Sequence, residues 1–249
     1  MVERGDRASF LWTFYDNLSM KETIQEVEKA IKNKSQIHHV VINAGKIVSM
    51  YKDKELCQSV NNADIINVDG QAVKWAAQFL DKPIKERVAG VDLFEKLIDF
   101  AYQNNYKIFL LGAKEEVVKK VVEKISQNYA PKVIAGYRNG YFKPEDESEI
   151  IQDIANSGAN MLFVAISSPK KENLLYKYRN ELKDVNFIMG VGGSFDVIAG
   201  KVKRAPLWMQ KNGLEWFYRF LQEPKRMWKR YLIGNTKFIF LVMKEKFKK

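Results

Sequence analysis

The sequence has few of the residues from which cross-links and metal sites are built. Its single cysteine, Cys57, excludes an internal disulfide and any metal site made of several cysteine thiolates. Only two histidines occur, the adjacent His38 and His39, which argues against a histidine-rich zinc site. The composition therefore predicts no metal centre.

Long apolar segments are also missing. Residues 1–7 lack the apolar stretch of a signal peptide. The longest apolar run near the other end, residues 238–243, is far shorter than the about 20 residues that span a bilayer. We therefore expect a cytoplasmic protein whose contact with a membrane is peripheral.

The net charge is confined to one end of the chain. Of 41 Lys and Arg and 30 Asp and Glu, residues 201–249 hold 14 and 3, which leaves 27 of each sign in residues 1–200. Three of the five tryptophans, Trp208, Trp216 and Trp228, lie in the same basic segment. A neutral body with a basic, aromatic end indicates an anionic partner: a membrane face, a polyphosphate or a nucleic acid.

Short apolar runs alternate with amphipathic segments along most of the chain. The predicted strands are residues 37–43, 64–68, 107–112, 132–136, 160–166 and 186–191. The predicted helices are residues 71–80, 91–103, 114–128, 145–156 and 170–182. Strands that are apolar throughout are buried on both faces, so the pattern predicts an α/β fold with a mainly parallel sheet and helices on both faces.

The charge balance divides the chain. It shifts between Lys201 and Pro206, while a length of 249 residues suits one domain with an addition. We expect an α/β body of residues 1–203 and a basic, helical appendage of residues 204–249.

Polar residues and glycines follow five of the predicted strands. They are Asn43, Asp69 with Gly70, Gly112, residues 167–169 and residues 190–194. The carboxyl ends of parallel strands meet at one edge of a sheet, where ligands bind. These residues therefore predict a single cleft.

Two charged residues near this edge each have two interpretations. Asp69 precedes the helix predicted from Gln71, so it is either an N-cap, worth about 1 kcal/mol, or a general base at the mouth of the sheet. Arg87 either binds a diphosphate through two hydrogen bonds or pairs at the surface with Asp92 or Glu86. The residues alone leave both questions open.

Residues 190–196 place three glycines after a strand. Glycines there let the backbone approach a phosphate or a sugar, although a tight turn alone would also explain them. Phe195 occupies the position of the last glycine of a dinucleotide-binding motif, and no P-loop lysine follows.

Residues 225–232 follow Pro224 and form a basic amphipathic pattern. Four basic side chains share one helical face, and Trp228 and Tyr231 lie on the other. This arrangement is typical of a helix on a membrane surface. A helix packed on the body with a solvated basic face is the alternative, and nucleic-acid binding is a third, weakened by the confinement of the charge to one end.

Seven short motifs occur in the order seen in the WecG/TagA/CpsF-type bacterial glycosyltransferases, which the chain resembles from about Ile37 to Tyr231. They are residues 68–70, 86–93, 140–142, 168–172, 190–196, 203–206 and 213–219. The resemblance implies a Rossmann-like body whose appendage meets the inner face of the cell membrane and helps to complete the site. It also implies inverting, metal-independent transfer of a hexose-type sugar from a UDP-sugar to a polyprenyl-diphosphate-linked saccharide, in teichoic acid, capsule or exopolysaccharide synthesis.

The resemblance also implies roles for single residues. Asp69 matches the base that deprotonates the acceptor hydroxyl, and Arg87 matches an arginine that binds the diphosphate of the leaving UDP. The implied donor-binding residues are Asn43, Tyr141, Lys171, Gly192, Gly193 and Asp196. The implied acceptor- and membrane-binding residues are Arg219, Arg226, Lys229 and Arg230. No Asp-x-Asp motif for a divalent metal occurs, so cationic side chains must meet the diphosphate charge.

Two positions depart from the family pattern. Many relatives have Thr where this chain has Val41, and Gln where it has Lys171. Both positions belong to the implied site, so the donor sugar is left open. The family also suggests a homo-oligomer in exchange with a monomer. A non-catalytic module that binds a nucleotide sugar, and a nucleic-acid-binding protein that uses the basic end, are the rival hypotheses.

Overall fold

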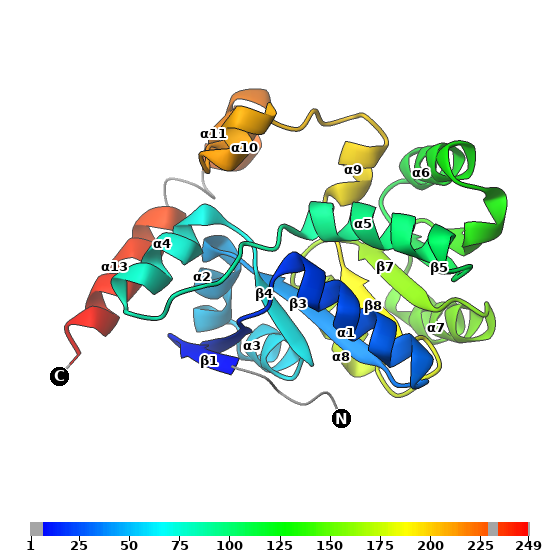
Figure 1. The fold of residues 1–249 in the computed structure, drawn as a ribbon, viewed down its shortest axis with the longest axis horizontal. Coiled ribbons are helices and arrows are strands. Elements are labelled where there is room, and N and C mark those ends of the chain that lie inside the picture. The colour runs from blue at the N-terminus through cyan, green and yellow to red at the C-terminus, as the bar shows by residue number, and fades with distance from the viewer. Residues whose placement is uncertain (1–6, 229–233, 249) are drawn as a thin grey trace.

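The computed structural model describes residues 7–228 and 234–248 (Figure 1). Within these residues, β1 (Arg7–Phe10) and β2 (Thr13–Asp16) pair antiparallel as a hairpin. Six further strands form one sheet, in which every neighbouring pair is parallel. They are β3 (Ile37–Ile42), β4 (Ile65–Val68), β5 (Ile108–Gly112), β6 (Ile134–Arg138), β7 (Met161–Ala165) and β8 (Phe187–Gly190).

The helices lie mostly between these strands. They are α1 (Met20–Lys32), α2 (Ala44–Lys52), α3 (Lys54–Asn61), α4 (Gln71–Phe79), α5 (Gly90–Gln103), α6 (Glu115–Asn128), α7 (Glu147–Asn156), α8 (Lys170–Lys177) and α9 (Ser194–Ile198). Two short 3-10 turns, η1 (Pro131–Val133) and η2 (Pro144–Asp146), precede β6 and α7. The predicted α/β, Rossmann-like fold is confirmed.

Each predicted strand overlaps an observed one, and the differences have local causes. The strand predicted from residue 132 begins at Ile134, because Pro131 starts the η1 turn and has no N–H to donate to a sheet. The helix predicted to residue 182 ends at Lys177. Helix α1 was not predicted, although a reciprocal capping box between Ser19 and Glu22 marks its start.

Successive strand side chains enter cores on opposite faces of the sheet. On β4, Ile65 packs with residues of α1 and α5, whereas Ile66 packs with residues of α2, α3 and α4. On β7, Phe163 joins the core under α5 and α6, and Val164 joins the core under α7 and α8. This period of two is why the strands are apolar throughout.

The strand order is β4-β3-β8-β7-β5-β6. It brings the carboxyl ends of these strands, whose residues were predicted to form one cleft, to the same edge of the sheet. The connection that leaves β3 leads to β4 at one edge, and the connection that leaves β5 leads to β6 at the other. Such a change of direction opens a crevice beyond the carboxyl ends of the central strands.

The last part of the chain is helical and falls into two groups. Helices α10 (Leu207–Lys211), α11 (Glu215–Gln222) and α12 (Pro224–Trp228) follow an extended segment after α9, and Figure 1 shows α10 and α11 set off from the rest of the ribbon. Helix α13 (Gly234–Lys246) packs against α2 and α4.

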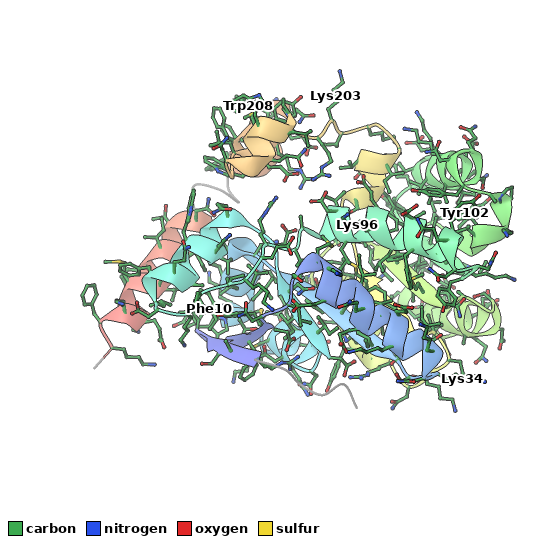
Figure 2. All side chains as sticks on the ribbon, viewed as in Figure 1. Phe10, Lys34, Lys96, Tyr102, Lys203 and Trp208 are labelled. Carbon is green, nitrogen blue, oxygen red and sulfur yellow. The ribbon has the colours of Figure 1, made fainter. Side chains whose placement is uncertain are left out.

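Helix α13 contributes to the core of the body. Its Phe238 and Val242 are buried, and the ring centroid of Phe238 lies 6.4 Å from that of Phe10 in β1 (Figure 2 labels Phe10). The division into residues 1–203 and 204–249 stays a prediction, but α13 is tied to the first of these parts by apolar packing.

Candidate active site

Asp69 lies directly after β4, at the carboxyl edge of the sheet. Its Oδ2 accepts a hydrogen bond of 3.3 Å from the backbone N–H of Gly90, the first residue of α5. The N-cap of the following helix, α4, is Gly70, which has no side chain with which to cap it. The interpretation of Asp69 as the N-cap of the helix from Gln71 is therefore wrong.

The protonation of Asp69 is set by several neighbours. Burial raises the pKa of its carboxyl most strongly, and the charges of Glu215 and Asp92 raise it further. The Arg87 guanidinium and the Gly90 N–H act in the opposite direction, but the pKa stays above its ordinary value. A carboxylate held in this way is a stronger base than an exposed one.

Arg87 faces Asp69 across the strand end. Its Nη1 lies 3.9 Å from Asp69 Oδ1 and 3.6 Å from Glu215 Oε2, and its side chain is 19% exposed. Neither partner of the alternative interpretation is used: Asp92 pairs with Arg204, and Glu86 accepts a hydrogen bond from the Met20 N–H. The structure thus brings together the two residues predicted to be catalytic.

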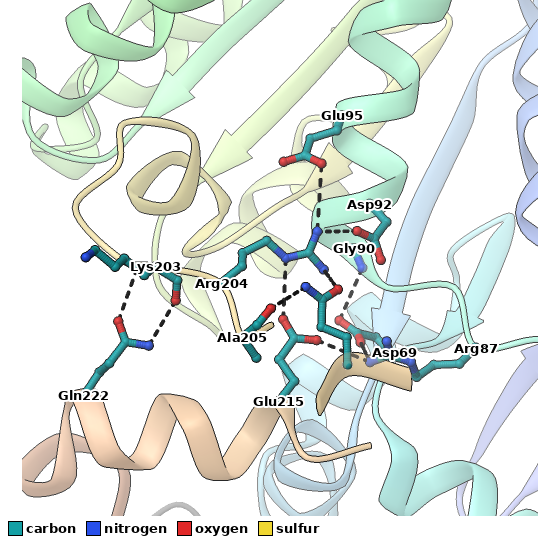
Figure 3. Close-up of polar contacts among 11 residues, drawn as sticks. Asp69, Arg87, Gly90, Asp92, Glu95, Lys203, Arg204, Ala205, Glu215 and Gln222 are labelled. Atoms are coloured by element: carbon teal, nitrogen blue, oxygen red, sulfur yellow. Dashed lines mark hydrogen bonds and ion pairs between the residues drawn. The ribbon is translucent and has the colours of Figure 1, made fainter. Parts of the chain in front are cut away.

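Two residues from the last part of the chain complete this cluster (Figure 3). Glu215, at the start of α11, lies between Arg87 and Arg204. Arg204 also bonds Asp92 of α5 at 2.5 Å and Gln210 of α10 at 2.9 Å. Both residues fall within motifs of the family pattern, but neither was given a role, because nothing in the local sequence indicates their distant partners.

Asn43 follows β3 and lies beside the Asp69 strand end. Its side chain caps α2 by accepting a hydrogen bond of 3.0 Å from the Lys46 N–H. A Cβ placed on Gly70 would stand 3.4 Å from the Cβ of Asn43. The role of Asn43 in donor binding stays a prediction.

Other predicted donor-binding residues follow β6 and β8. Tyr141 is 73% exposed, and its backbone N–H donates a hydrogen bond to the side-chain oxygen of Asn139. Gly192 has a φ of +53°, and Gly193 is the N-cap of α9. Asp196, in the first turn of α9, accepts backbone hydrogen bonds from residues 201 and 202 through its carbonyl oxygen.

Lys171 is buried in an ionic cluster. Its Nζ lies 2.6 Å from Glu172 Oε1, and Lys46 Nζ lies 2.7 Å from the same oxygen. Burial alone would raise the pKa of Glu172, but the two ammonium groups outweigh it and bring the pKa to about 2. The stem of Lys171 covers Gly190, where an added Cβ would come within 2.9 Å of it. The structure thus assigns a charge partner to Lys171 within the body.

The residues predicted to bind the acceptor are described only in part. Arg219 lies on α11 with Nη2 near Gly193, at 3.9 Å from an added Cβ. Arg226 belongs to α12, and its side chain lies outside the described structure. Lys229 and Arg230 lie outside the described residues altogether.

The surface of α10 and α11 carries large apolar side chains. Leu207, Trp208 and Leu221 are strongly exposed, and Trp216 and Phe217 less so (Figure 2 labels Trp208). Among the helices of residues 7–228 and 234–248, none is both long and apolar enough to cross a bilayer.

Comparison with known proteins identifies the family of the chain. Residues 8–249 match the family described as the glycosyl transferase WecG/TagA/CpsF family. Three relatives are each named N-acetylglucosaminyldiphosphoundecaprenol N-acetyl-beta-D-mannosaminyltransferase. The Bacillus subtilis (strain 168) protein is 36% identical over 240 residues, which cover 93% of this chain and 89% of the relative.

The other two relatives give a similar result. The protein of Bacillus spizizenii (strain ATCC 23059 / NRRL B-14472 / W23) is 38% identical over 185 residues, covering 74% of this chain and 70% of the relative. The Staphylococcus aureus (strain MW2) protein is 31% identical over 245 residues, covering 97% and 93%. The chain therefore belongs to the WecG/TagA/CpsF family and is a glycosyltransferase.

Proposed function

We propose that the chain transfers a hexose-type sugar from a UDP-sugar to a polyprenyl-diphosphate-linked saccharide that serves cell-envelope polysaccharide synthesis. The observation that carries the proposal is the pairing of Asp69 and Arg87 at the carboxyl edge of the sheet. The relatives are named as transferases that act on undecaprenyl-diphosphate-linked N-acetylglucosamine, which supports the class of acceptor.

The proposed reaction uses one base and one cation. Asp69 takes the proton of the acceptor hydroxyl, whose oxygen attacks the anomeric carbon from the face opposite UDP. The bond between that carbon and the UDP oxygen breaks, its electron pair leaves with UDP, and the configuration of the sugar inverts. Arg87 stabilises the charge that develops on the leaving diphosphate. The raised pKa of Asp69 suits this role, because it brings the base closer to neutral pH.

The proposal includes transfer without a metal ion. Arg87 and Arg219 lie at the strand ends with the residues proposed to bind the donor, and guanidinium groups match the geometry of phosphate oxygens. Turnover should therefore persist in excess chelator after the chain has been stripped of divalent ions. Loss of turnover that returns with added Mg²⁺ or Mn²⁺ would contradict this part.

The donor sugar is left open within the proposal, because the site departs from the family pattern near the catalytic pair. A Cβ on Gly90 would stand 3.5 Å from Val41 Cγ2, so an apolar side chain lies beside the N–H that binds Asp69. Lys171 replaces a neutral glutamine with a charged group. A screen of UDP-sugars by mass spectrometry, with a synthetic lipid-diphosphate monosaccharide as acceptor, would identify the donor.

We also propose that the protein works at the inner face of the cell membrane. Support comes from the exposed apolar side chains of α10 and α11 and from the excess of basic residues after Lys201. A polyprenyl-linked acceptor stays in the bilayer, so the enzyme must come to it.

The central test is the Asp69→Asn variant. We expect it to fold and to lose transfer from UDP-sugar to the lipid acceptor, with residual turnover reduced at least about a hundredfold, because the amide cannot accept the proton. Retained turnover would refute Asp69 as the base.

A further inference from the structure

The last part of the chain places one carboxylate next to the proposed catalytic pair. Glu215 lies between two arginines from different segments: Oε2 is 3.6 Å from Arg87 Nη1, and Oε1 is 3.7 Å from Arg204 Nε (Figure 3). The Glu215 side chain is 27% exposed, so solvent screens these attractions less than it screens a surface ion pair.

Arg204 anchors Glu215 to the body. It bonds Asp92 in the first turn of α5 and lies 3.9 Å from Glu95 one turn later. Helix α5 is also the helix whose first N–H, that of Gly90, binds Asp69. The position of Glu215 is thus fixed, through Arg204, relative to the element that holds the base.

The contacts of Arg87 leave its hydrogen-bonding groups available. Within the described residues, Arg87 has ion pairs with Asp69 and Glu215 and no hydrogen bond. A guanidinium has five N–H donors, so a diphosphate can still be bound. The two carboxylates compete for one cation: without Glu215, Asp69 would be the remaining described carboxylate beside Arg87.

We propose that Glu215 is a positioning residue, which holds Arg87 between the leaving group and the base and prevents it from closing onto Asp69. Glu215 touches no reacting atom, and its role makes the docking of α11 a condition for a working catalytic pair. This inference rests on the proposed function. A tight Arg87–Asp69 pair would be catalytically poor, because it would weaken the base and draw the guanidinium away from the diphosphate.

The electrostatics of Asp69 support the proposal. The groups that face it are Arg87, the Gly90 N–H, Glu215 and Asp92, and Glu215 is one of the two charges that raise its pKa beyond the effect of burial. Removing the charge of Glu215 favours the ionised form of Asp69. The pKa of Asp69 should therefore fall.

The test compares full-length variants in the transfer assay from about pH 5 to about pH 9, with Asp69→Asn as the reference for lost chemistry. For Glu215→Gln we expect kcat to fall by about tenfold to a hundredfold, the loss typical of a misplaced catalytic group, and the KM for the UDP-sugar to stay within about twofold. The acid limb of kcat/KM should move to lower pH. Glu215→Asp, which retains the charge, should keep the limb near its wild-type position.

Glu95→Gln is the matched control. It removes a carboxylate that contacts Arg204 but is not among the groups that shift the pKa of Asp69, so the acid limb should not move. Glu215→Ser, which suits the first turn of a helix, supplies the same measurement if the glutamine variant does not fold.

The outcomes separate this inference from the proposed function. Glu215→Gln with wild-type kcat and an unmoved acid limb overturns the role of Glu215, even when Asp69→Asn is inactive. A loss of kcat with an unmoved limb also overturns it, because docking alone would then explain the loss. Turnover retained by Asp69→Asn overturns instead the assignment of the base.

Discussion

The Arg219 guanidinium of α11 lies over Gly193 at the start of α9, with Nη2 3.9 Å from the position that a Cβ of this glycine would take. One residue was predicted to bind the lipid acceptor and the other the donor. Their proximity places the helix from the basic end of the chain over the strand-end glycines, where the proposed function brings donor and acceptor together.

Alanine substitutions at the two neighbouring glycines should have different effects. At Gly193 φ is −77° and the nearest atom lies at an ordinary contact distance, so Gly193→Ala should change the free energy of unfolding by less than about 0.5 kcal/mol. At Gly192 φ is +53°, where a side chain costs about 1–2 kcal/mol. Urea denaturation measures both.

The Gly193→Ala variant also tests whether Gly193 takes part in ligand binding. If a phosphate or sugar approaches the backbone of Gly193, the alanine variant should raise the KM for the UDP-sugar without loss of stability. Unchanged KM in the folded variant would remove Gly193 from the donor site.

Asp69→Asn should be at least as stable as the wild type at neutral pH. The folded-state pKa of Asp69 is raised, so ionisation costs stability as the pH rises from the unfolded value, about 3.9, through the folded value. The amide avoids this cost, so its advantage in melting temperature should be larger at about pH 8 than at about pH 4. An advantage that shrinks with rising pH would contradict the raised pKa.

The buried ionic cluster should be important for stability. Lys46→Met leaves the Glu172 carboxylate with Lys171 as its remaining described partner, and removing one member of a buried pair costs about 3–5 kcal/mol, here at the lower end. The exposed pair of Lys32 and Glu28 is the control: Lys32→Met should destabilise the protein much less than Lys46→Met, because solvent screens this pair. Equal effects in urea denaturation would show that burial does not strengthen the cluster.

The pH dependence of the same cluster has a defined sign. The pKa of Glu172 is lowered to about 2, so its contribution to stability is present above the unfolded value, about 4.3, and is lost as the pH falls toward 2. Acid unfolding of Lys46→Met should therefore begin at a higher pH than that of the wild type, as followed by circular dichroism.

Membrane binding should depend on the apolar surface of α10 and α11. Trp208→Ser with Leu221→Ser should reduce co-sedimentation with anionic vesicles at least about tenfold, since burying each such side chain is worth about 1.5–3 kcal/mol. Tyr102→Ser on α5, which Figure 2 shows away from Trp208, is the control and should bind as the wild type. Equal binding of all three proteins would contradict the proposal.

Truncation after Pro206 is a poorer test of membrane binding, because it also removes Phe238 from the core.

The sequence predicted the sheet well because the signal is local. Strands such as β5 and β7 are short apolar runs, and the alternation with amphipathic helices is enough to indicate parallel strands buried on both faces. The hairpin of β1 and β2 was not predicted, because its two short strands are held partly by distant groups, such as the Asp64 carbonyl that accepts a hydrogen bond from Arg7.

The sequence by itself determined the alternating body, the polar strand ends and the basic end of the chain, since each depends on residue type and spacing along the chain. Only the tertiary structure decided which charges meet. It separated Asp69 from α4, gave Arg87 to Glu215 rather than to Asp92, and gave Lys171 a buried partner in Glu172. Ion pairs are set by distance in space and by exclusion of water, and neither can be read from the order of residues.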